Sequence, residues 1–425
     1  MAAFLDLQIE RAVAGGRMLA RHDGQIVFVQ GAIPGERVRA RIERRQKQVL
    51  FADTVEVLEP SADRRTPHCD LACGGSAYAH IQYERQRALK ADIIADAFAR
   101  IAKQPLPMPV PVTASPEAGY RMRARVHVDG ARWGFYREGT HVLCDAAATA
   151  QLRADTAAAI DAFLRAHGPA LAGLGAITVS ENIAGTERVL VLEPRESASP
   201  QMRAGIAAWA GSLSEGLSGV VDADGRVRAG SGWVTDTAEA LWPTRAPVPA
   251  TVSWRRRGAS FFQGNRYLVG ALVSEVLRAC GDAAKIIDLY AGGGLFSVAL
   301  AARGAAVIAV EMDGSSTRDL ADNAAPLGER IVSLVSPVEP IVTQRPPFAP
   351  DVVVMDPPRV GASPEAVAGI AQWKAPRIVY VSCDPPTLAR DCAKFFAAGY
   401  RLTSAQAFDL FPNTAHVETV VVMER

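Results

Sequence analysis

The chain has 425 residues, which is too long for one ordinary hydrophobic core and predicts two or three domains. Apolar residues make up 49% and charged residues 21%, which excludes a disordered chain, and 46 Lys and Arg residues nearly cancel 45 Asp and Glu residues. No run of 18 uncharged apolar residues occurs, which excludes a transmembrane helix. The N-terminus carries Asp6 and Glu10 inside its apolar stretch, unlike a signal peptide, so we expect a cytoplasmic protein.

Residues 1–60 show short strands separated by turns, the pattern of a small β-barrel. One strand covers residues 25–29, and residues 37–42 alternate charged and apolar side chains after a Pro-Gly turn. The basic side chains between positions 37 and 47 are Arg37, Arg39, Arg41, Arg44, Arg45 and Lys47. They could simply keep a strand face soluble; the sharper interpretation is an oligonucleotide-binding barrel whose arginines contact phosphates.

Residues 61–255 form the second region that the sequence predicts. It starts with a turn-rich loop and continues into residues 83–101, whose apolar side chains recur at helical spacing. The proline-rich residues 105–116 read as a linker. Strands mixed with alanine-rich helices follow, and Arg121, Arg123 and Arg125 alternate along the first of them. We expect a central α+β domain that binds RNA.

From residue 256 to residue 425 the pattern changes to strands alternating with helices. Buried strands are expected at residues 285–290, 306–310, 351–355 and 377–382, with a helix at 295–302. This alternation predicts an α/β fold with a Rossmann-like, doubly wound parallel sheet, whose ligands bind at the carboxyl ends of the strands. Glu311, Asp356 and Cys383 each follow one of these strands, so we expect them to share a crevice.

A glycine-rich turn after the first of these strands suggests a nucleotide site. Gly292, Gly293 and Gly294 expose helix N-terminal amides, but no third spaced glycine completes a dinucleotide motif. Glu311, after the next strand, is suited to accept hydrogen bonds from two ribose hydroxyls. An adenosine without a pyrophosphate fits this pattern better than NAD, and S-adenosylmethionine is such a ligand.

Three further residues are candidates for the chemistry. Asp356 precedes Pro357 and Pro358, which could also be an ordinary helix-starting turn. Cys383 follows a strand and could act as a thiolate nucleophile, although a lone cysteine is more often a small core residue. Glu418 leads into the last strand, and by itself would be read as a surface acid.

Five motifs taken together resemble the RNA uracil-5-methyltransferase family, which makes 5-methyluridine. They are Phe-Gln-Gly-Asn at 262–265, Asp-Leu-Tyr-Ala-Gly at 288–292, Asp-Pro-Pro-Arg at 356–359, Val-Ser-Cys-Asp-Pro at 381–385, and the ending Phe-Asp-Leu-Phe-Pro through His-Val-Glu at 408–418. Residues 1–60 resemble the TRAM domain of its ribosomal-RNA members. The resemblance covers essentially the whole chain.

This resemblance implies a role for each matching residue. Cofactor contacts would come from Gln263, Tyr290, Glu311 and Asp356, with Cys383 as the nucleophile and Glu418 as the base that removes a proton. The residue types suit the reaction, because uracil C5 becomes nucleophilic only after a thiolate has added to C6. The target base must be single-stranded or flipped out of its stack to be reached.

The cysteines depart from the family pattern. Many ribosomal-RNA members hold a four-iron, four-sulfur cluster with four cysteines. Here Cys69 and Cys73 are closer together than that pattern has them, and Ser76 stands where the family has a cysteine after the Gly-Gly pair; Cys144 matches the fourth ligand. A labile cluster on three cysteines, a zinc site and a cluster-free loop all remain open.

We therefore predict an S-adenosylmethionine-dependent RNA uridine C5-methyltransferase that acts on 23S ribosomal RNA rather than on tRNA. We expect it to be a cytoplasmic monomer that does not associate with membranes. The enzyme alternative is a methyltransferase for exocyclic amino groups, which would need no cysteine nucleophile. The non-enzyme alternative is an RNA-binding factor that keeps the fold without the activity; the intact motifs argue against it.

Overall fold

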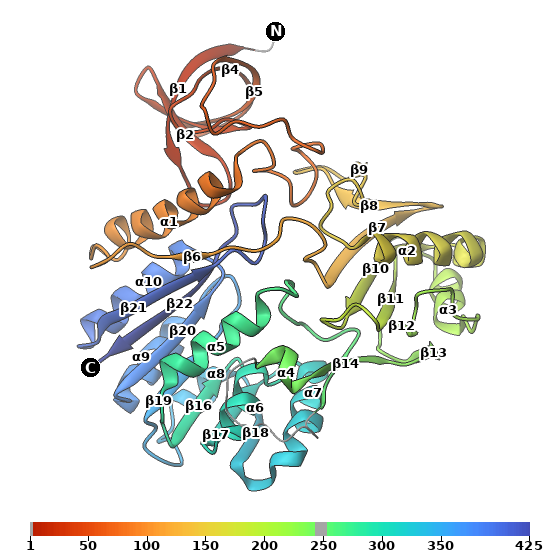
Figure 1. The fold of residues 1–425 in the computed structure, drawn as a ribbon, viewed down its shortest axis with the longest axis vertical. Helices are drawn as coiled ribbons and strands as arrows, with labels where there is room; N and C mark the ends of the chain where they lie inside the picture. The colour runs from red at the N-terminus through yellow and green to blue at the C-terminus, as the bar shows by residue number, and fades with distance from the viewer. Residues whose placement is uncertain (1–2, 243–252) are drawn as a thin grey trace.

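The computed structural model describes residues 3–242 and 253–425. Its strands form a closed barrel, a seven-stranded sheet, a two-stranded sheet and an eight-stranded sheet. Figure 1 shows the barrel at one end of the molecule, the seven-stranded sheet beside it, and the large sheet with its helices at the other end. Within the described ranges, no helix is long and apolar enough to cross a membrane. The predicted central domain includes positions 243–252, which lie outside the described residues, as do positions 1–2.

The N-terminal barrel confirms the prediction of a small closed β-structure. Its strands are hydrogen-bonded in the order β1-β2-β3-β5-β4, and β1 pairs with β4 to close the barrel. Alternate residues of each strand point inward, as in the buried series Val27, Val29, Val38 and Ala40. The strands are β1 (Phe4–Ala12), β2 (Met18–His22), β3 (Gln25–Gln30), β4 (Arg37–Gln46) and β5 (Val49–Glu59).

The central seven-stranded sheet has the order β13-β12-β11-β10-β7-β8-β9, and only the β11–β12 pair is parallel. A separate hairpin of β14 and β15 connects it to the last domain. Of the three alternating arginines, Arg123 and Arg125 lie in β7, whereas Arg121 lies two residues before it. The elements are β7 (Arg123–Asp129), β8 (Arg132–Tyr136), β9 (Leu143–Cys144), α2 (Ala154–His167), the 3-10 helix Gly168–Ala170, β10 (Leu174–Glu181), β11 (Arg188–Pro194), α3 (Pro200–Ala208), β12 (Gly219–Asp222), β13 (Val227–Gly230), β14 (Trp233–Thr237), α4 (Ala238–Leu241) and β15 (Ser253–Arg257).

The eight-stranded sheet has the order β18-β17-β16-β19-β20-β22-β21-β6 and is Rossmann-like, with its first five strands parallel and β22 reversed. Helices α5, α6 and α7 cover one face, and α1, α8, α9 and α10 cover the other. The elements are α5 (Val269–Cys280), β16 (Lys285–Leu289), α6 (Leu295–Ala302), β17 (Ala306–Glu311), α7 (Gly314–Ala324), the 3-10 segment Ala325–Arg330, β18 (Ile331–Val335), α8 (Val338–Val342), β19 (Val352–Met355), α9 (Pro364–Trp373), β20 (Arg377–Ser382), α10 (Pro385–Ala397), β21 (Arg401–Phe408) and β22 (Glu418–Glu424).

Two segments from the second sequence region belong to this last sheet. The proline-rich linker contributes the short strand β6 (Val112–Thr113), which pairs with β21 at the sheet edge. Helix α1 (Tyr83–Arg100) lies between the barrel and the sheet (Figure 1). Leu89 and Ile93 of α1 pack into the barrel core, whereas Ile94 and Phe98 pack into the core of the eight-stranded sheet. One helix therefore holds the first and last domains together.

Candidate active site

The carboxyl ends of the parallel strands lie together at one end of the eight-stranded sheet, as predicted. Residues after β16, β17, β19 and β20 are Tyr290, Met312, Asp356 and Cys383, and Glu311 is the last residue of β17. This end of the sheet therefore brings together the glycine-rich turn, the acidic side chains of Glu311 and Asp356, and the Cys383 thiol. Glu418 is a third acidic side chain there. Glu418 arrives from the opposite direction, as the first residue of the reversed strand β22.

The turn after β16 has a backbone shaped for close approach of a ligand. Tyr290 has φ +62°, a left-handed conformation that is uncommon and costly for a tyrosine and is concentrated at functional sites. Gly294 has φ +85°, a conformation that is strained for any residue with a side chain, and a Cβ atom built there would lie 2.5 Å from Leu320 Cδ1 of α7. Gly292 has open space where a Cβ would lie.

Glu311 is tied to this turn by backbone hydrogen bonds. Its Oε2 accepts a hydrogen bond from the amide of Gly292 at 2.8 Å, and its Oε1 accepts one from the amides of Met312 and Asp313, each at 2.7 Å. A cavity of about 490 Å³ opens beside it, lined by Tyr290, Glu311, Met312, Ser336 and Val338 among others. This volume lies within the usual range of small-ligand sites.

Asp288 lies in β16, the strand that leads into the glycine-rich turn, and its carboxyl group is only partly hydrogen-bonded. Its side chain is fully buried, and Ser297 donates a hydrogen bond to Oδ2. Among the residues that the structure describes, no group donates to Oδ1. Burial raises the pKa of Asp288 to about 7. Asp288 does not line the cavity beside Glu311, so this unsatisfied oxygen lies inside the fold rather than open to a ligand.

Asp356 and Gln263 meet on the other side of β16. Gln263 Nε2 donates a long hydrogen bond of 3.4 Å to Asp356 Oδ2, and the Asp356 amide donates to Leu289 O at 3.3 Å. Burial and then the charge of Asp288 raise the pKa of Asp356 to about 8. Neither Gln263 nor Asp356 lines the cavity that contains Tyr290 and Glu311. The four predicted cofactor residues therefore lie near the same end of the sheet, but only Tyr290 and Glu311 line the cavity.

Cys383 and Glu418 come from adjacent antiparallel strands. Ser382 pairs with Thr419, so the residues one step further, Cys383 and Glu418, are neighbours at the sheet edge. Burial, Glu418, Asp356 and Asp384 together raise the pKa of the Cys383 thiol to about 12, with Arg359 opposing them. Burial and then Asp356 raise the pKa of Glu418 well above its usual range. The sequence prediction of a surface acid for Glu418 taken alone is wrong, because its side chain is buried.

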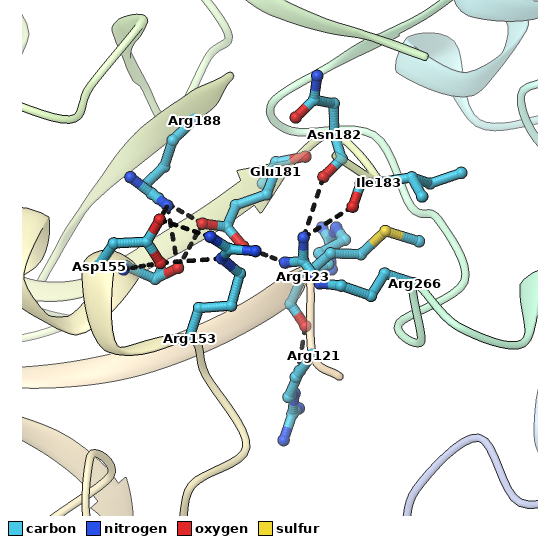
Figure 2. Close-up of polar contacts among 12 residues, drawn as sticks. Arg121, Arg123, Arg153, Asp155, Glu181, Asn182, Ile183, Arg188 and Arg266 are labelled. Atoms are coloured by element: carbon cyan, nitrogen blue, oxygen red, sulfur yellow. Dashed lines mark hydrogen bonds and ion pairs between the residues drawn. The ribbon is translucent and has the colours of Figure 1, made fainter. Parts of the chain in front are cut away.

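A second acidic centre, which the sequence does not suggest, lies where the central sheet meets the segment after Gln263. Figure 2 shows Glu181 of β10 between Arg188 and Arg266, and both guanidinium groups donate to its carboxylate. Arg266 also donates to the carbonyl of Ile183 at 2.9 Å. The side chains of Glu181, Arg188 and Arg266 are almost completely buried. This ion cluster fixes the segment 262–266 to the central domain; its sequence signal is an arginine directly after the Phe-Gln-Gly-Asn motif.

A disulfide, rather than a metal site, ties the cysteine loop to the central sheet. Cys73 and Cys144 form a disulfide, while Cys69 is a free thiol. Ser76 is buried, and in residues 3–242 and 253–425 no group of three or more His, Cys, Asp or Glu side chains is arranged to hold a metal ion. Three sulfurs, two of them bonded to each other, do not fit a four-iron cluster, so no step below involves one.

The basic side chains between positions 37 and 47 of the barrel fall into two groups. Arg37 pairs with Glu59, Arg39 with Asp6 and Glu56, and Arg41 with Glu43. In the part of the chain that the structure describes, no carboxylate lies within 4.0 Å of the cationic groups of Arg44, Arg45 and Lys47. The Arg44 guanidinium lies 4.1 Å from the centre of the Phe51 ring, and Phe28 packs beside that ring at 5.7 Å. The free cations and aromatic rings therefore gather at one end of β4.

Comparisons with known proteins agree with this arrangement. The tRNA (uracil-5-)-methyltransferase family model matches residues 343–425, and the TRAM domain model matches residues 5–55. The 23S rRNA (uracil(1939)-C(5))-methyltransferase RlmD of Chromohalobacter salexigens is 34% identical over 99% of this chain and 89% of its own length. The RlmD of Thiobacillus denitrificans is 32% identical over 96% of this chain and 97% of its own length.

A solved structure also resembles the whole fold. The Pyrococcus abyssi tRNA (uracil-54, C5)-methyltransferase, determined with S-adenosyl-L-homocysteine, has a TM-score of 0.73 to this chain at 21% identity. It covers 98% of this chain, and this chain covers 99% of it. The likeness confirms the predicted combination of a barrel, a central α+β region and a Rossmann-like domain.

Proposed function

Because this chain belongs to the RNA uracil-5-methyltransferase family and methylates uridine C5 in RNA with S-adenosylmethionine, we propose that its substrate is one uridine of 23S ribosomal RNA and that Cys383 forms a covalent adduct with that base. The observation that carries the covalent route is the meeting of Cys383 and Glu418 on adjacent strand ends beside Asp356. Methylation of C5 through a C6 adduct requires two groups beside the target uracil: a thiol that adds to C6 and a carboxyl group that takes the C5 proton.

The residues around the glycine-rich turn suit the cofactor. We assign Glu311 to the ribose hydroxyls, Tyr290 to the cavity wall, and Gln263 with Asp356 to the end nearest the reacting base. The cavity of about 490 Å³ supports the roles of Tyr290 and Glu311, which line it, and the hydrogen bond from Gln263 to Asp356 supports placing those two together. When bound, S-adenosylmethionine supplies an electrophilic methyl group on a positively charged sulfonium.

The chain's own groups carry the remaining chemistry. The Cys383 thiolate attacks C6 of the flipped uracil, and the electrons of the C5–C6 double bond move toward C5 and O4. C5 bonds to the transferred methyl group as the bond from that group to the sulfonium sulfur breaks. Because burial raises the pKa of Glu418, its carboxyl must first lose its own proton; it then accepts the C5 proton, the double bond re-forms, and the C6–sulfur bond breaks to return the thiolate. Because burial and neighbouring acids raise the pKa of Cys383 to about 12, the thiol of the cofactor-free protein is neutral, and it must give up its proton before the sulfur attacks C6.

The exocyclic-amine alternative has less support, because methylation of an amino group needs neither a nucleophilic thiol nor a second base at that position. Ribosomal RNA is favoured by the names of the curated relatives and by the TRAM match at residues 5–55. We infer that the enzyme works in the cytoplasm and as a monomer.

The experiment that tests this proposal maps 5-methyluridine in ribosomal RNA and tRNA from a strain that lacks the gene. Loss of one 5-methyluridine from 23S RNA, restored by the wild-type gene and not by the Cys383→Ala variant, is the expected result. Loss from tRNA alone would assign the substrate to tRNA instead. Unchanged 5-methyluridine in both RNA classes would contradict the proposed substrate.

A further inference from the structure

The loop between β21 and β22, residues 409–417, lies directly before Glu418 and is held mainly by residues more than 140 positions earlier in the chain. Asp409 donates its amide to Thr113 O at 3.0 Å, and the Leu410 carbonyl accepts a hydrogen bond from Asn265 Nδ2 at 3.0 Å. At the loop tip, Tyr78 donates its amide to Asn413 O at 2.8 Å. The loop is therefore fixed by segments that lie far from it in the sequence.

Helix α1 provides the strongest of these anchors. The ammonium group of Lys90 pairs with Asp409 Oδ1 and also donates to the carbonyl of Phe411 at 3.1 Å. Both Lys90 and Asp409 have fully buried side chains, so this ion pair is shielded from water and sensitive to loss of either partner. One cation thus holds two points of the same loop.

A second anchor on α1 lies about one turn before Lys90. Gln86 Nε2 donates to Asn413 Oδ1 at 2.9 Å, and Gln86 Oε1 accepts from the Asn413 amide at 2.9 Å. Asn413 has φ +64°, a conformation that an asparagine tolerates best when its neighbours fix it. The reciprocal pair with Gln86 supplies that restraint.

The loop carries an aromatic wall toward the candidate site. A Cβ atom built on Gly264 would lie 3.2 Å from the Phe411 ring, so this ring packs on the backbone next to Gln263. Arg121 lies 5.9 Å from the centre of the same ring, and Tyr120 meets it edge-on at 6.4 Å. Displacing the loop would therefore move Phe411 away from Gln263 and disturb the approach to Glu418.

We propose that Lys90 and Gln86 of α1 are positioning residues for methylation: they hold the 409–417 loop so that Phe411 walls the uracil site and Glu418 faces Cys383. Because α1 also packs into the barrel core, this contact connects the N-terminal barrel with the reacting centre. The inference rests on the roles proposed above for Cys383 and Glu418. It assigns no chemical step to Lys90 or Gln86, which touch neither reacting atom.

The test replaces the buried ion pair by an apolar pair of similar volume, Lys90→Met with Asp409→Leu, which avoids leaving one charge buried alone. We expect unchanged binding of S-adenosylhomocysteine and a fall of about 30-fold or more in the methylation rate at saturating RNA, because a misplacement of about 1 Å can cost about a hundredfold. Gln86→Leu, which cuts the second anchor, should lower the rate by about five- to tenfold. The matched control is Arg228→Met with Asp222→Leu, a largely buried ion pair at the far edge of the central sheet, which should leave the rate within about twofold of wild type.

Hydrogen exchange measured on the same proteins separates this inference from the proposed function. The Lys90→Met, Asp409→Leu protein should exchange amides at 409–417 at least about tenfold faster, with β22 unchanged. Wild-type methylation rates together with wild-type exchange would overturn the inference. If the double variant does not fold, Gln86→Leu decides by the same two measurements. If wild-type enzyme forms no Cys383 adduct, the proposed chemistry fails, whereas exchange in the loop still decides the role of α1.

Discussion

Two groups of buried acids in this molecule differ in how their charge is balanced. Glu181 in the central domain is surrounded by the guanidinium groups of Arg188 and Arg266, and its carboxylate is fully engaged. Asp356 and Glu418 at the strand ends have no cation beside them in the described residues, and their pKa values are raised by burial and by neighbouring acids. The first arrangement stabilises a junction between domains; the second leaves two buried carboxyl groups without a compensating charge, at the positions proposed for cofactor binding and for the base.

The largest effect on stability should come from breaking the balanced group. Glu181→Gln leaves the buried Arg266 guanidinium without a counter-charge and leaves Arg188 only its ion pair with Asp155 at 3.4 Å, which together cost about 3–5 kcal/mol of unfolding free energy. Urea unfolding followed by circular dichroism measures this. The exposed pair of Arg125 and Glu193 is the matched control, and Glu193→Gln should cost less than about 1 kcal/mol. Equal losses in both variants would show that the Glu181 cluster is not a special junction.

The disulfide tests the neighbouring loop. Cys73 and Cys144 are 71 residues apart, and closing a loop of this length stabilises a protein by about 2–4 kcal/mol. Cys144→Ser should therefore lower the unfolding free energy by that amount under oxidising conditions and by much less in the presence of a thiol reductant. Iron and sulfide bound at four per chain after anaerobic purification would contradict the disulfide and restore the cluster interpretation.

Neutralising the unbalanced acids should have the opposite sign to Glu181→Gln. The pKa of Asp356 is about 8 when the protein is folded and near 4 when it is unfolded, so its contribution to stability is present below pH 4 and is lost as the pH rises through 8. Asp356→Asn should thus stabilise the cofactor-free protein by about 2 kcal/mol at pH 9 and hardly at all at pH 4. Thermal melts across this pH range give the answer; a variant less stable than wild type at pH 9 would show that Asp356 has a partner that compensates its charge.

The smallest effect concerns the barrel. Within residues 3–242 and 253–425, Arg44, Arg45 and Lys47 have no acid partner within 4.0 Å, whereas Arg37, Arg39 and Arg41 are paired with carboxylates. Replacing the first three by glutamine should reduce the slope of log affinity for RNA against log salt by about 2, while replacing the second three should change it by less than about 1. Fluorescence anisotropy at several salt concentrations distinguishes the two triple variants. Equal slopes would mean that the pairs open when RNA binds.

The sequence predicted the strand-end residues well because strand, turn and helix recur in a fixed order there. Glu311, Asp356 and Cys383 could each be placed at a strand end by counting residues, since parallel strands end at the same edge. Glu418 and Gln263 depended on the family resemblance, because nothing local marks a buried acid before the last strand or a glutamine in a turn.

The interdomain contacts could not be read from the sequence. Glu181 and Arg266 are 85 residues apart, and Lys90 and Asp409 are 319 residues apart, so no local pattern connects them. One signal was present but ambiguous: Lys90 lies four residues before Ile94 and therefore falls on the buried stripe of α1. A lysine on such a stripe indicates a buried acidic partner, but only the folded chain identifies it as Asp409. The pairing of the barrel arginines likewise depends on strand register.

The most direct test of the account is to trap the adduct that Cys383 and Glu418 should control together. We expect wild-type enzyme and S-adenosylmethionine to form a covalent complex with RNA carrying 5-fluorouridine, visible on a denaturing gel, because fluorine cannot leave as a proton does. Glu418→Gln should accumulate the same complex with ordinary uridine, Cys383→Ala should form none, and cofactor affinity should be nearly unchanged in both. If neither substrate gives a Cys383-dependent complex, covalent catalysis is contradicted and the exocyclic-amine alternative becomes the better explanation.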